Sequence, residues 1–298
     1  MRPNCRTSAS LRRPIMLRAA GRWCRRYSKR VAWVMFLGGI LLFLVAPFIV
    51  IIVGSLAGGA REYIAFPPRS LSLQWYFRIP GRYLSAFQTS LIVALAVSGV
   101  AAVLGSLAAF AIVRGTHPGR ALVQALFSSP LQIPHIVVGV AVLQFYYLLV
   151  QRWGVDLLGT VSGLIAAHVV VTVPYVIGSV VAVLTGFNVA LEEAALNLGA
   201  SRISTLRRVT LPIIAPGVIV GVLYAFIMSF GNVPISLFLV KPGVTTLPVE
   251  VFFGIEFDFN PSLLALSTIV VLFSVSLVML LQRIVGLDLL RAPAQRGG

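Results

Sequence analysis

Hydrophobic residues in this 298-residue chain are concentrated in six long stretches that contain no Asp, Glu, Lys or Arg. The stretches cover residues 31–60, 83–113, 121–151, 157–191, 209–240 and 259–282. Each is longer than the roughly 20 residues that a helix needs to cross about 30 Å of hydrocarbon. They are also too long for the roughly 10-residue strands of a membrane β-barrel. The pattern therefore predicts an all-α integral membrane protein with six transmembrane helices.

Charged residues, which make up only 11% of the chain, predict how the helices are threaded through the membrane. Ten of the 24 Lys and Arg precede residue 31, and positive residues beside membrane spans are retained in the cytoplasm. This places the N-terminus in the cytoplasm, and six spans return the C-terminus there. With this topology, only six of the 24 Lys and Arg lie on the outer side of the membrane. Membrane topology therefore accounts for the net charge of +16, and no nucleic-acid partner is expected.

The basic segment at residues 1–30 has more than one interpretation. The apolar stretch that follows it has 30 residues, whereas the apolar region of a secretory signal has roughly 7–15, so a retained membrane anchor is expected. The segment is also rich in Arg and Ser and free of acidic residues, which leaves an organellar presequence or a start at Met16 as alternatives. Cys5 and Cys24 both lie in this tail and are expected to be reduced thiols.

Small residues and prolines predict how the helices pack and bend. The second span is rich in Ala, Gly and Ser, which predicts that it is buried in the bundle. Pro130 and Pro134 predict a bent beginning of the third span. Pro174 and Pro234 lie within the fourth and fifth spans, where an interrupted helix can line a solute pathway. A proline kink absorbed by the neighbouring helices is the alternative.

The longest predicted cytoplasmic loop, residues 185–214, has the features of two short helices joined by a turn. Asn188 can cap the first helix, Glu192 and Glu193 suit its first turns, and Gly199 can end it in a left-handed conformation. A second helix is expected from Ser201 to Arg208. Such a projection can dock in the groove of a partner protein, and a loop without a partner is the alternative. The expected docking face consists of Ala190, Ala194 and Ala195, with Leu211-Pro212 closing the unit.

The chain lacks the residues that would let it drive transport by itself. A phosphate-binding loop needs a Lys after a glycine-rich turn, and neither Lys29 nor Lys241 has that context. ATP must therefore be handled by another polypeptide. Secondary transport requires ionisable groups within the membrane, and His135 and His168 are the candidates in the spans. They could relay protons, or they could be packed, hydrogen-bonded residues. A metal site is not expected, because these two and His117 lie in separate segments.

The 185–214 loop carries a pattern that resembles a known family. Membrane subunits of binding-protein-dependent ABC importers, of the MetI-like superfamily, have Glu-Ala-Ala, three residues, Gly, nine residues, Ile, one residue and Leu-Pro at this place. The chain departs from the pattern only in having Val for Ile. The matching residues are Glu193, Ala194, Ala195, Gly199, Val209, Leu211 and Pro212.

The resemblance implies the type I ABC importer permease fold. Residues 85–285 would form its core of five transmembrane helices, including the 185–214 coupling loop. Residues 31–84 would add a first transmembrane helix and an outer segment, and residues 1–30 and 286–298 would be cytoplasmic tails. The protein would be a multi-pass component of the bacterial inner membrane and not an enzyme.

The resemblance also implies partners. The coupling loop would sit in a cleft of an ATP-binding subunit dimer, which would use ATP and Mg, while this chain would bind no cofactor. The other partners would be a sister permease, identical or homologous, an extracytoplasmic solute-binding protein and the surrounding lipid. A secondary transporter is the competing class.

Further segments resemble the second permease of spermidine/putrescine-type importers. Those relatives commonly have an acidic residue where Gly231 or Asn232 stands here, so the sequence departs from them where a carboxylate would meet a cation. Aminophosphonate, ferric iron and thiamine importers are alternatives. The acidic residues Glu250, Glu256 and Asp258 could meet a cation, dock the binding protein or simply be solvated. The segments that carry the resemblance are 66–68, 73–76, 229–236, 241–243 and 246–249, and the candidate substrate path is Ser229, Asn232, Pro234 and Ser236.

Overall fold

The computed structural model describes residues 14–58, 68, 70–115, 119–257 and 260–291. Within these ranges six helical segments are long and apolar enough to cross a membrane, which confirms the predicted helix count. The fifth span along the chain, Arg202–Phe230, joins three consecutive helical elements. Each of the other five spans is a single helix or part of one. The long helices are α1 (Pro14–Ser55), α3 (Gly81–Arg114), α5 (His135–Trp153), α6 (Val161–Thr185), α9 (Leu211–Phe230) and α12 (Ser262–Arg291).

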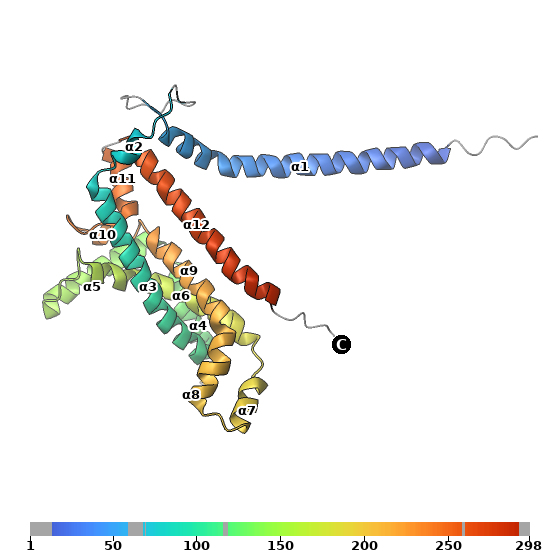
Figure 1. Cartoon of the computed structure of the whole chain (residues 1–298). Helices are drawn as coiled ribbons and strands as arrows, with labels where there is room; N and C mark the ends of the chain where they lie inside the picture. Colours follow the sequence, from blue (N-terminus) through green and yellow to red (C-terminus); the bar gives the residue numbers. More distant parts are fainter. Residues whose placement is uncertain (1–13, 59–67, 69, 116–118, 258–259, 292–298) are drawn as a thin grey trace, which may run out of the picture.

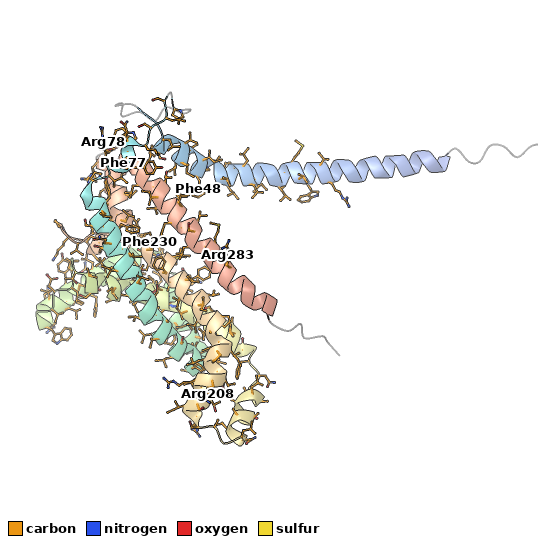
Figure 2. The ribbon with its side chains drawn as sticks, in the orientation of Figure 1. Phe48, Phe77, Arg78, Arg208, Phe230 and Arg283 are labelled. Atoms are coloured by element: carbon orange, nitrogen blue, oxygen red, sulfur yellow. The ribbon has the colours of Figure 1, made fainter. Side chains whose placement is uncertain are left out.

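Short helical elements mark the two ends of the bundle. Helices α7 and α8 lie at one end, and α2 and α11 lie at the opposite end (Figure 1). Figure 2 shows the same separation for Arg208 and Arg78. Segments that the sequence assigns to opposite sides of the membrane therefore lie at opposite ends. The short elements are α2 (Gln74–Phe77), α4 (Arg120–Ser128), η1 (Ser129–Leu131), α7 (Ala190–Asn197), α8 (Arg202–Thr205), η2 (Leu206–Thr210), α10 (Ser236–Leu239) and α11 (Leu247–Phe257).

Three helices, α3, α6 and α9, form the centre of the bundle and pack extensively against one another. Small residues allow the helix backbones to approach closely. This matters in a membrane because the hydrophobic effect does not drive helices together there, and they associate through tight van der Waals packing. A Cβ added at Gly221 of α9 would lie 2.7 Å from the Cα of Val176 in α6, and one at Gly217 would lie 2.9 Å from the carbonyl oxygen of Ser179. The predicted burial of the second span is confirmed, since Ala94, Val97 and Ala101 of α3 are fully buried.

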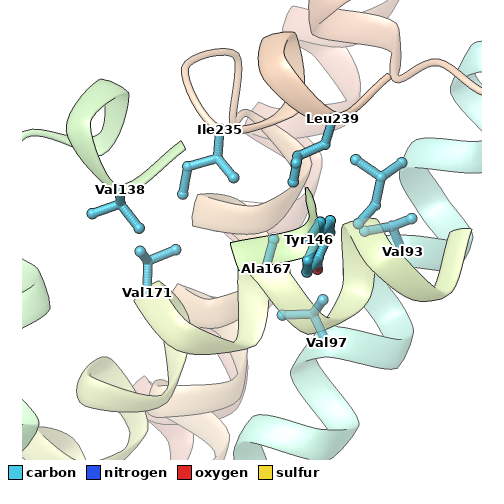
Figure 3. Close-up of a cluster of buried hydrophobic side chains, with 9 residues drawn as sticks. Val93, Val97, Val138, Tyr146, Ala167, Val171, Ile235 and Leu239 are labelled. Atoms are coloured by element: carbon cyan, nitrogen blue, oxygen red, sulfur yellow. The ribbon is translucent and has the colours of Figure 1, made fainter. Parts of the chain in front are cut away.

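One buried cluster joins α5 and α10 to this centre. Figure 3 shows Tyr146 of α5 and Leu239 of α10 facing side chains from α3 and α6. The Tyr146 hydroxyl donates a hydrogen bond of 2.7 Å to the carbonyl oxygen of Gly163, so its polar atom is satisfied inside the apolar cluster. The α3 and α6 side chains are Val93, Val97, Leu164, Ala167 and Val171.

Helices α1 and α12 lie outside the three-helix centre. The membrane-spanning part of α1 extends away from the bundle and contacts α12 (Figure 1). Its end is fixed to the segment before α3, because Ser55 is hydrogen bonded to the Tyr76 hydroxyl at 2.6 Å. The Trp75 indole also donates to the Ala57 carbonyl oxygen at 3.0 Å. Apolar side chains along α1, such as Phe43, are exposed, as expected for a helix surrounded by lipid or by another membrane chain.

The prolines behave differently from one span to the next. Pro130 lies within η1 and Pro134 directly precedes α5, so the chain passes through α4, η1 and α5 as separate elements, which confirms the bent beginning of the third span. The chain also leaves the helical conformation around Pro234, between α9 and α10. At Pro174 the structure agrees with the second alternative, because α6 continues through this residue. Pro174 is buried in the bundle, where neighbouring helices can accommodate its missing backbone donor.

Two predicted boundaries also differ from the structure. The second span begins at Gly81, inside the segment that was expected to lie outside the membrane, because Pro80 has the φ of –59° that suits a residue just before a helix. The fifth uncharged stretch begins at residue 209, whereas the helical span begins at Arg202, because α8 and η2 continue directly into α9.

The close contact of α9 with α6 can be tested with one methyl group. Gly221→Ala should destabilise the detergent-solubilised protein by about 1–3 kcal/mol, because the added Cβ overlaps α6 backbone that cannot move aside. Gly178→Ala is the matched control, since nothing lies within 4 Å of a Cβ there. The melting temperature measures both, and equal values for the two variants would contradict the close packing.

Candidate functional site

Helix α7 begins and ends with the signals that the sequence predicts. The backbone N–H of Ala190 donates to Asn188 Oδ1 at 3.0 Å, which confirms Asn188 as the capping residue. Gly199 follows the helix with a φ of +86°, which confirms the left-handed conformation. The N–H groups of Gly199 and Ala200 donate to the carbonyl oxygens of Leu196 and Ala195, the two bonds that define a Schellman motif. The turn after α7 is therefore fixed by backbone hydrogen bonds.

The second half of the 185–214 segment differs from the prediction. A helix begins directly after Ser201, as expected, and the Ser201 hydroxyl caps it by accepting a hydrogen bond of 3.3 Å from the Ser204 N–H. However, α8 is continuous with η2 and α9, so Leu211-Pro212 does not close the unit. The element η2 is a π-helical turn in which the Leu211 N–H bonds to the Leu206 carbonyl oxygen, five residues back. A π-turn accommodates Pro212 because proline has no N–H for the usual α-helical bond.

Glu192 of α7 connects three parts of the chain at this end of the bundle. The Arg114 guanidinium, at the end of α3, donates to both carboxylate oxygens of Glu192, at 2.5 and 3.0 Å. The Thr210 hydroxyl of η2 donates to the same carboxylate at 2.5 Å. Arg114 also lies over the Phe187 ring, 5.1 Å from its centroid. Arg114, Glu192 and Thr210 also line a cavity of about 340 Å³ between α3, α7, α8 and η2.

The surroundings of Glu192 favour its charged form. The hydrogen bond from Arg114 lowers the pKa of the carboxyl, partial burial opposes this effect, and the Thr210 hydroxyl lowers the pKa further, leaving it below the usual value for glutamate. The ion pair therefore stabilises α7 fully above the ordinary glutamate pKa and loses this effect as pH falls through the lowered value.

The residues of the Glu-Ala-Ala pattern lie on and below this helix. Glu193, Ala194 and Gly199 are exposed and Ala195 is partly buried, whereas Val209 is half-buried in η2. Leu211 and Pro212 are exposed at the beginning of α9. Apolar side chains are also exposed on the same projection, with Leu198 at 89% and Ile203 at 70%. The projection thus presents a partly apolar surface that a partner protein could cover.

The candidate substrate-path residues surround the break between α9 and α10. Ser229 and Ser236 lie on either side of His168 of α6, with their hydroxyl oxygens 2.9 Å from Nδ1 and 3.0 Å from Nε2. All three residues are buried. The geometry of His168 matches a packed, hydrogen-bonded residue, which was one of its two interpretations. The three side chains join the middle of α6 to both sides of the helix break.

Asn232 and Pro234 shape the break itself. Asn232 is buried, and its Oδ1 accepts a hydrogen bond of 2.9 Å from the Ile235 N–H. The amide oxygen thereby satisfies a backbone donor that the interrupted helix exposes. The Pro234 carbonyl oxygen faces Gly139 of α5, where a Cβ would lie only 3.0 Å away. Asn232 has a structural contact in this conformation, and its contact with a solute stays a prediction.

Sequence reasoning missed the partners that hold these residues. Arg114 and Thr210 are not part of a recognisable motif, and Glu192 precedes the family pattern by one position. An acid at the start of a helix and a base at the end of another were visible signals, but their pairing across 78 residues depends on the fold. Among the described residues no group of three His, Cys, Asp or Glu could hold a metal ion. His117, Cys5, Asp258, Phe66 and Pro67 lie outside the described residues.

Comparison with solved structures shows the class of fold. The chain is similar to a bacterial alginate ABC transporter, solved in complex with an alginate pentasaccharide-bound periplasmic protein. The TM-score is 0.63 at 19% identity, covering 88% of this chain and 98% of the other. The fold is therefore that of an ABC importer permease, as the resemblance implied.

Sequence comparisons then identify the family. Residues 101–290 match the family described as the inner membrane component of binding-protein-dependent transport systems, and the chain belongs to this family. It is 31% identical to the spermidine/putrescine transport system permease protein PotC of Escherichia coli K12, over 84% of this chain and 92% of PotC. It is 32% identical to the putrescine transport system permease protein PotI of the same organism, over 67% and 72%. The chain is thus a permease of the bacterial inner membrane.

The contact of Glu192 with Arg114 predicts how the attachment of α7 depends on pH. Hydrogen exchange of the α7 amides, corrected for the intrinsic rate, should be constant from about pH 7 to 5 and should rise below the ordinary glutamate pKa of about 4.3. The carboxylate is protonated only there, because its pKa is lowered. In Glu192→Gln the exchange should be faster between pH 7 and 5 and should not rise further at lower pH. A rise already between pH 7 and 5 would contradict the ion pair.

Proposed function

We propose that this permease belongs to an ATP-driven importer and that α7 and α8 dock on an ATP-binding subunit in the cytoplasm. The observation that carries the proposal is the projection of residues 190–205, which is fixed by the turn at Gly199 and exposes apolar side chains at one end of the bundle. Its Glu-Ala-Ala pattern supports the same assignment. A dimer of the partner subunit would bind ATP and Mg, and this chain would bind no cofactor.

The remaining partners follow from the two ends and the sides of the bundle. An extracytoplasmic binding protein would deliver solute to the end that carries α2 and α11, where Glu250 and Glu256 lie on α11. A sister permease, identical or homologous, would complete the pathway beside this chain. The exposed apolar surface of α1 is consistent with a place beside lipid or beside that sister chain. Both termini would lie in the cytoplasm, as the distribution of Lys and Arg predicts.

Two substitutions at Gly199 test the docking assignment. Gly199→Val should reduce solute uptake per ATP hydrolysed about tenfold, because a β-branched residue is strongly disfavoured at a φ of +86° and the turn would rearrange. Gly199→Asn is the matched control, since Asn tolerates the left-handed conformation. Uptake and ATP hydrolysis are measured in proteoliposomes, after the amounts of inserted permease and co-purified ATP-binding subunit have been compared.

Space around Gly199 does not explain such a loss, because nothing lies within 4 Å of a Cβ at this position. The effect must therefore come from the backbone conformation. Unchanged coupling in Gly199→Val, or failure of the wild-type permease to co-purify with an ATP-binding subunit, would count against the proposal.

The solute that we propose is a polyamine such as spermidine or putrescine. The support is the similarity to PotC and PotI, whose names specify these solutes. The buried residues around the break between α9 and α10 carry hydroxyl, amide and imidazole groups, so the described part of this region supplies no carboxylate for a cation. Selectivity would then reside largely in the separate binding protein, and the membrane path would supply hydrogen-bonding groups.

Uptake measurements distinguish polyamines from the alternative solutes. Vesicles containing the complete importer should accumulate radiolabelled spermidine or putrescine when ATP is supplied, whereas thiamine, ferric iron and an aminophosphonate should not compete. ATP-driven uptake of one of these three, with no polyamine uptake, would overturn the solute assignment. Uptake driven by a pH gradient without ATP would instead support secondary transport.

A further inference from the structure

We infer that Arg114 and Thr210 are positioning residues that hold Glu192, so that α7 moves as one body with the central helices α3 and α9. This inference rests on the proposed docking of α7 on an ATP-binding subunit. It adds a direct connection from the projection to α3, in addition to the chain connections through the turns at either end of α7. The connection consists of three side chains from three separate segments.

Helix α7 needs such a connection because it has only eight residues. Isolated helices of this length are unstable in water, so its conformation depends on capping and on contacts with the rest of the protein. The segments on both sides of α7 are short turns rather than continuous helix, and the hydrogen bonds that hold the turn after α7 lie within that turn and do not reach the membrane helices. If these segments were the only links to the membrane helices, part of any displacement of α7 would be lost in bending them.

The pairing of Arg114 with Glu192 is well suited to transmit a displacement. Arg114 is in the last turn of α3 and Glu192 is in the first turn of α7, the positions where each charge also interacts favourably with its own helix dipole. The two parallel hydrogen bonds fix the relative orientation of both groups, which a single bond would not. The Glu192 side chain is only 16% exposed, so solvent screens the pair less than a surface ion pair.

Thr210 extends the connection to the helix that crosses the membrane next. The residue is 2% exposed, and its hydroxyl reaches Glu192 from the π-turn that leads directly into α9. The neighbouring Glu193 is exposed and remains available to a partner. The two acidic residues thus have separate roles, Glu192 toward the membrane helices and Glu193 toward the docking surface.

A measurement on the permease alone tests the connection without any solute. Spin labels at Leu107→Cys of α3 and Leu198→Cys after α7 occupy exposed positions, with Cys5 and Cys24 replaced by Ser. In lipid nanodiscs the distance distribution between the labels should be narrow for otherwise wild-type protein and clearly broader for Glu192→Gln. Thr210→Val, which keeps the side-chain shape and removes the hydroxyl, should broaden it less. Equal distributions in all three proteins would overturn the inference.

The complete importer provides the second test. In proteoliposomes, Glu192→Gln should lower spermidine uptake per ATP hydrolysed about tenfold, while the ATP-binding subunit still co-purifies. The exchange Arg114→Glu with Glu192→Arg should recover part of the loss, because it restores opposite charges in the same place. Asp156→Asn is the matched control, since it removes an exposed ion pair with Lys241 at 3.3 Å at the other end of the bundle.

The outcomes separate this inference from the proposed function. If the wild-type importer couples ATP to uptake and Glu192→Gln couples equally well, the connection through Glu192 is wrong and the docking proposal stands. If the wild-type permease binds no ATP-binding subunit, the proposed function fails, and the spin-label distances still decide whether Glu192 holds α7 to α3. If Glu192→Gln does not insert, Thr210→Val and the charge exchange carry the test.

Discussion

The close approach of α6 and α9 is the contact on which the rest of the structure depends. Gly217 and Gly221 bring the α9 backbone against Val176 and Ser179, and α3 packs against both helices. Lipid is as apolar as these helices, so tight packing rather than water exclusion holds them together. The centre provides a fixed frame to which the break around Pro234 and the projection at residues 190–205 are attached.

A frame of this kind permits an interrupted helix inside the membrane. The chain leaves the helical conformation after Phe230, which frees backbone groups that lipid cannot hydrogen bond. Asn232 satisfies one of them through its contact with the Ile235 N–H, and His168 ties Ser229 and Ser236 to α6. The polar residues in this region therefore have a structural basis whether or not a solute also contacts them. These polar residues are buried, and they lie at the only break in a central helix that the described residues show.

Most of the fold could be predicted from the sequence because it depends on the lengths of the apolar stretches and on local backbone chemistry. Helix count follows from stretch length, and the cap at Asn188, the beginning of a helix at Ser201 and the left-handed Gly199 follow from backbone chemistry. Two proline effects could not be decided from the sequence, which left two alternatives open for Pro174. Pro174 is absorbed by its packed surroundings, and Pro212 is accommodated by a π-turn, so in both cases tertiary packing decides the outcome.

The candidate site shows a similar division. The Glu-Ala-Ala pattern identified the projection, but nothing in the order of residues indicates that Glu192 meets Arg114 and Thr210. That contact exists because α3 is long enough to carry its last turn down to the level of α7, beyond the helix centre buried against α6 and α9. The length of α3 and the rigidity of the three-helix centre therefore belong to one arrangement. A projection attached through Glu192 to helices that could slide past one another would move without moving the pathway. The glycine contacts that prevent such sliding at one level of the bundle are what would make a side-chain connection at its end mechanically useful.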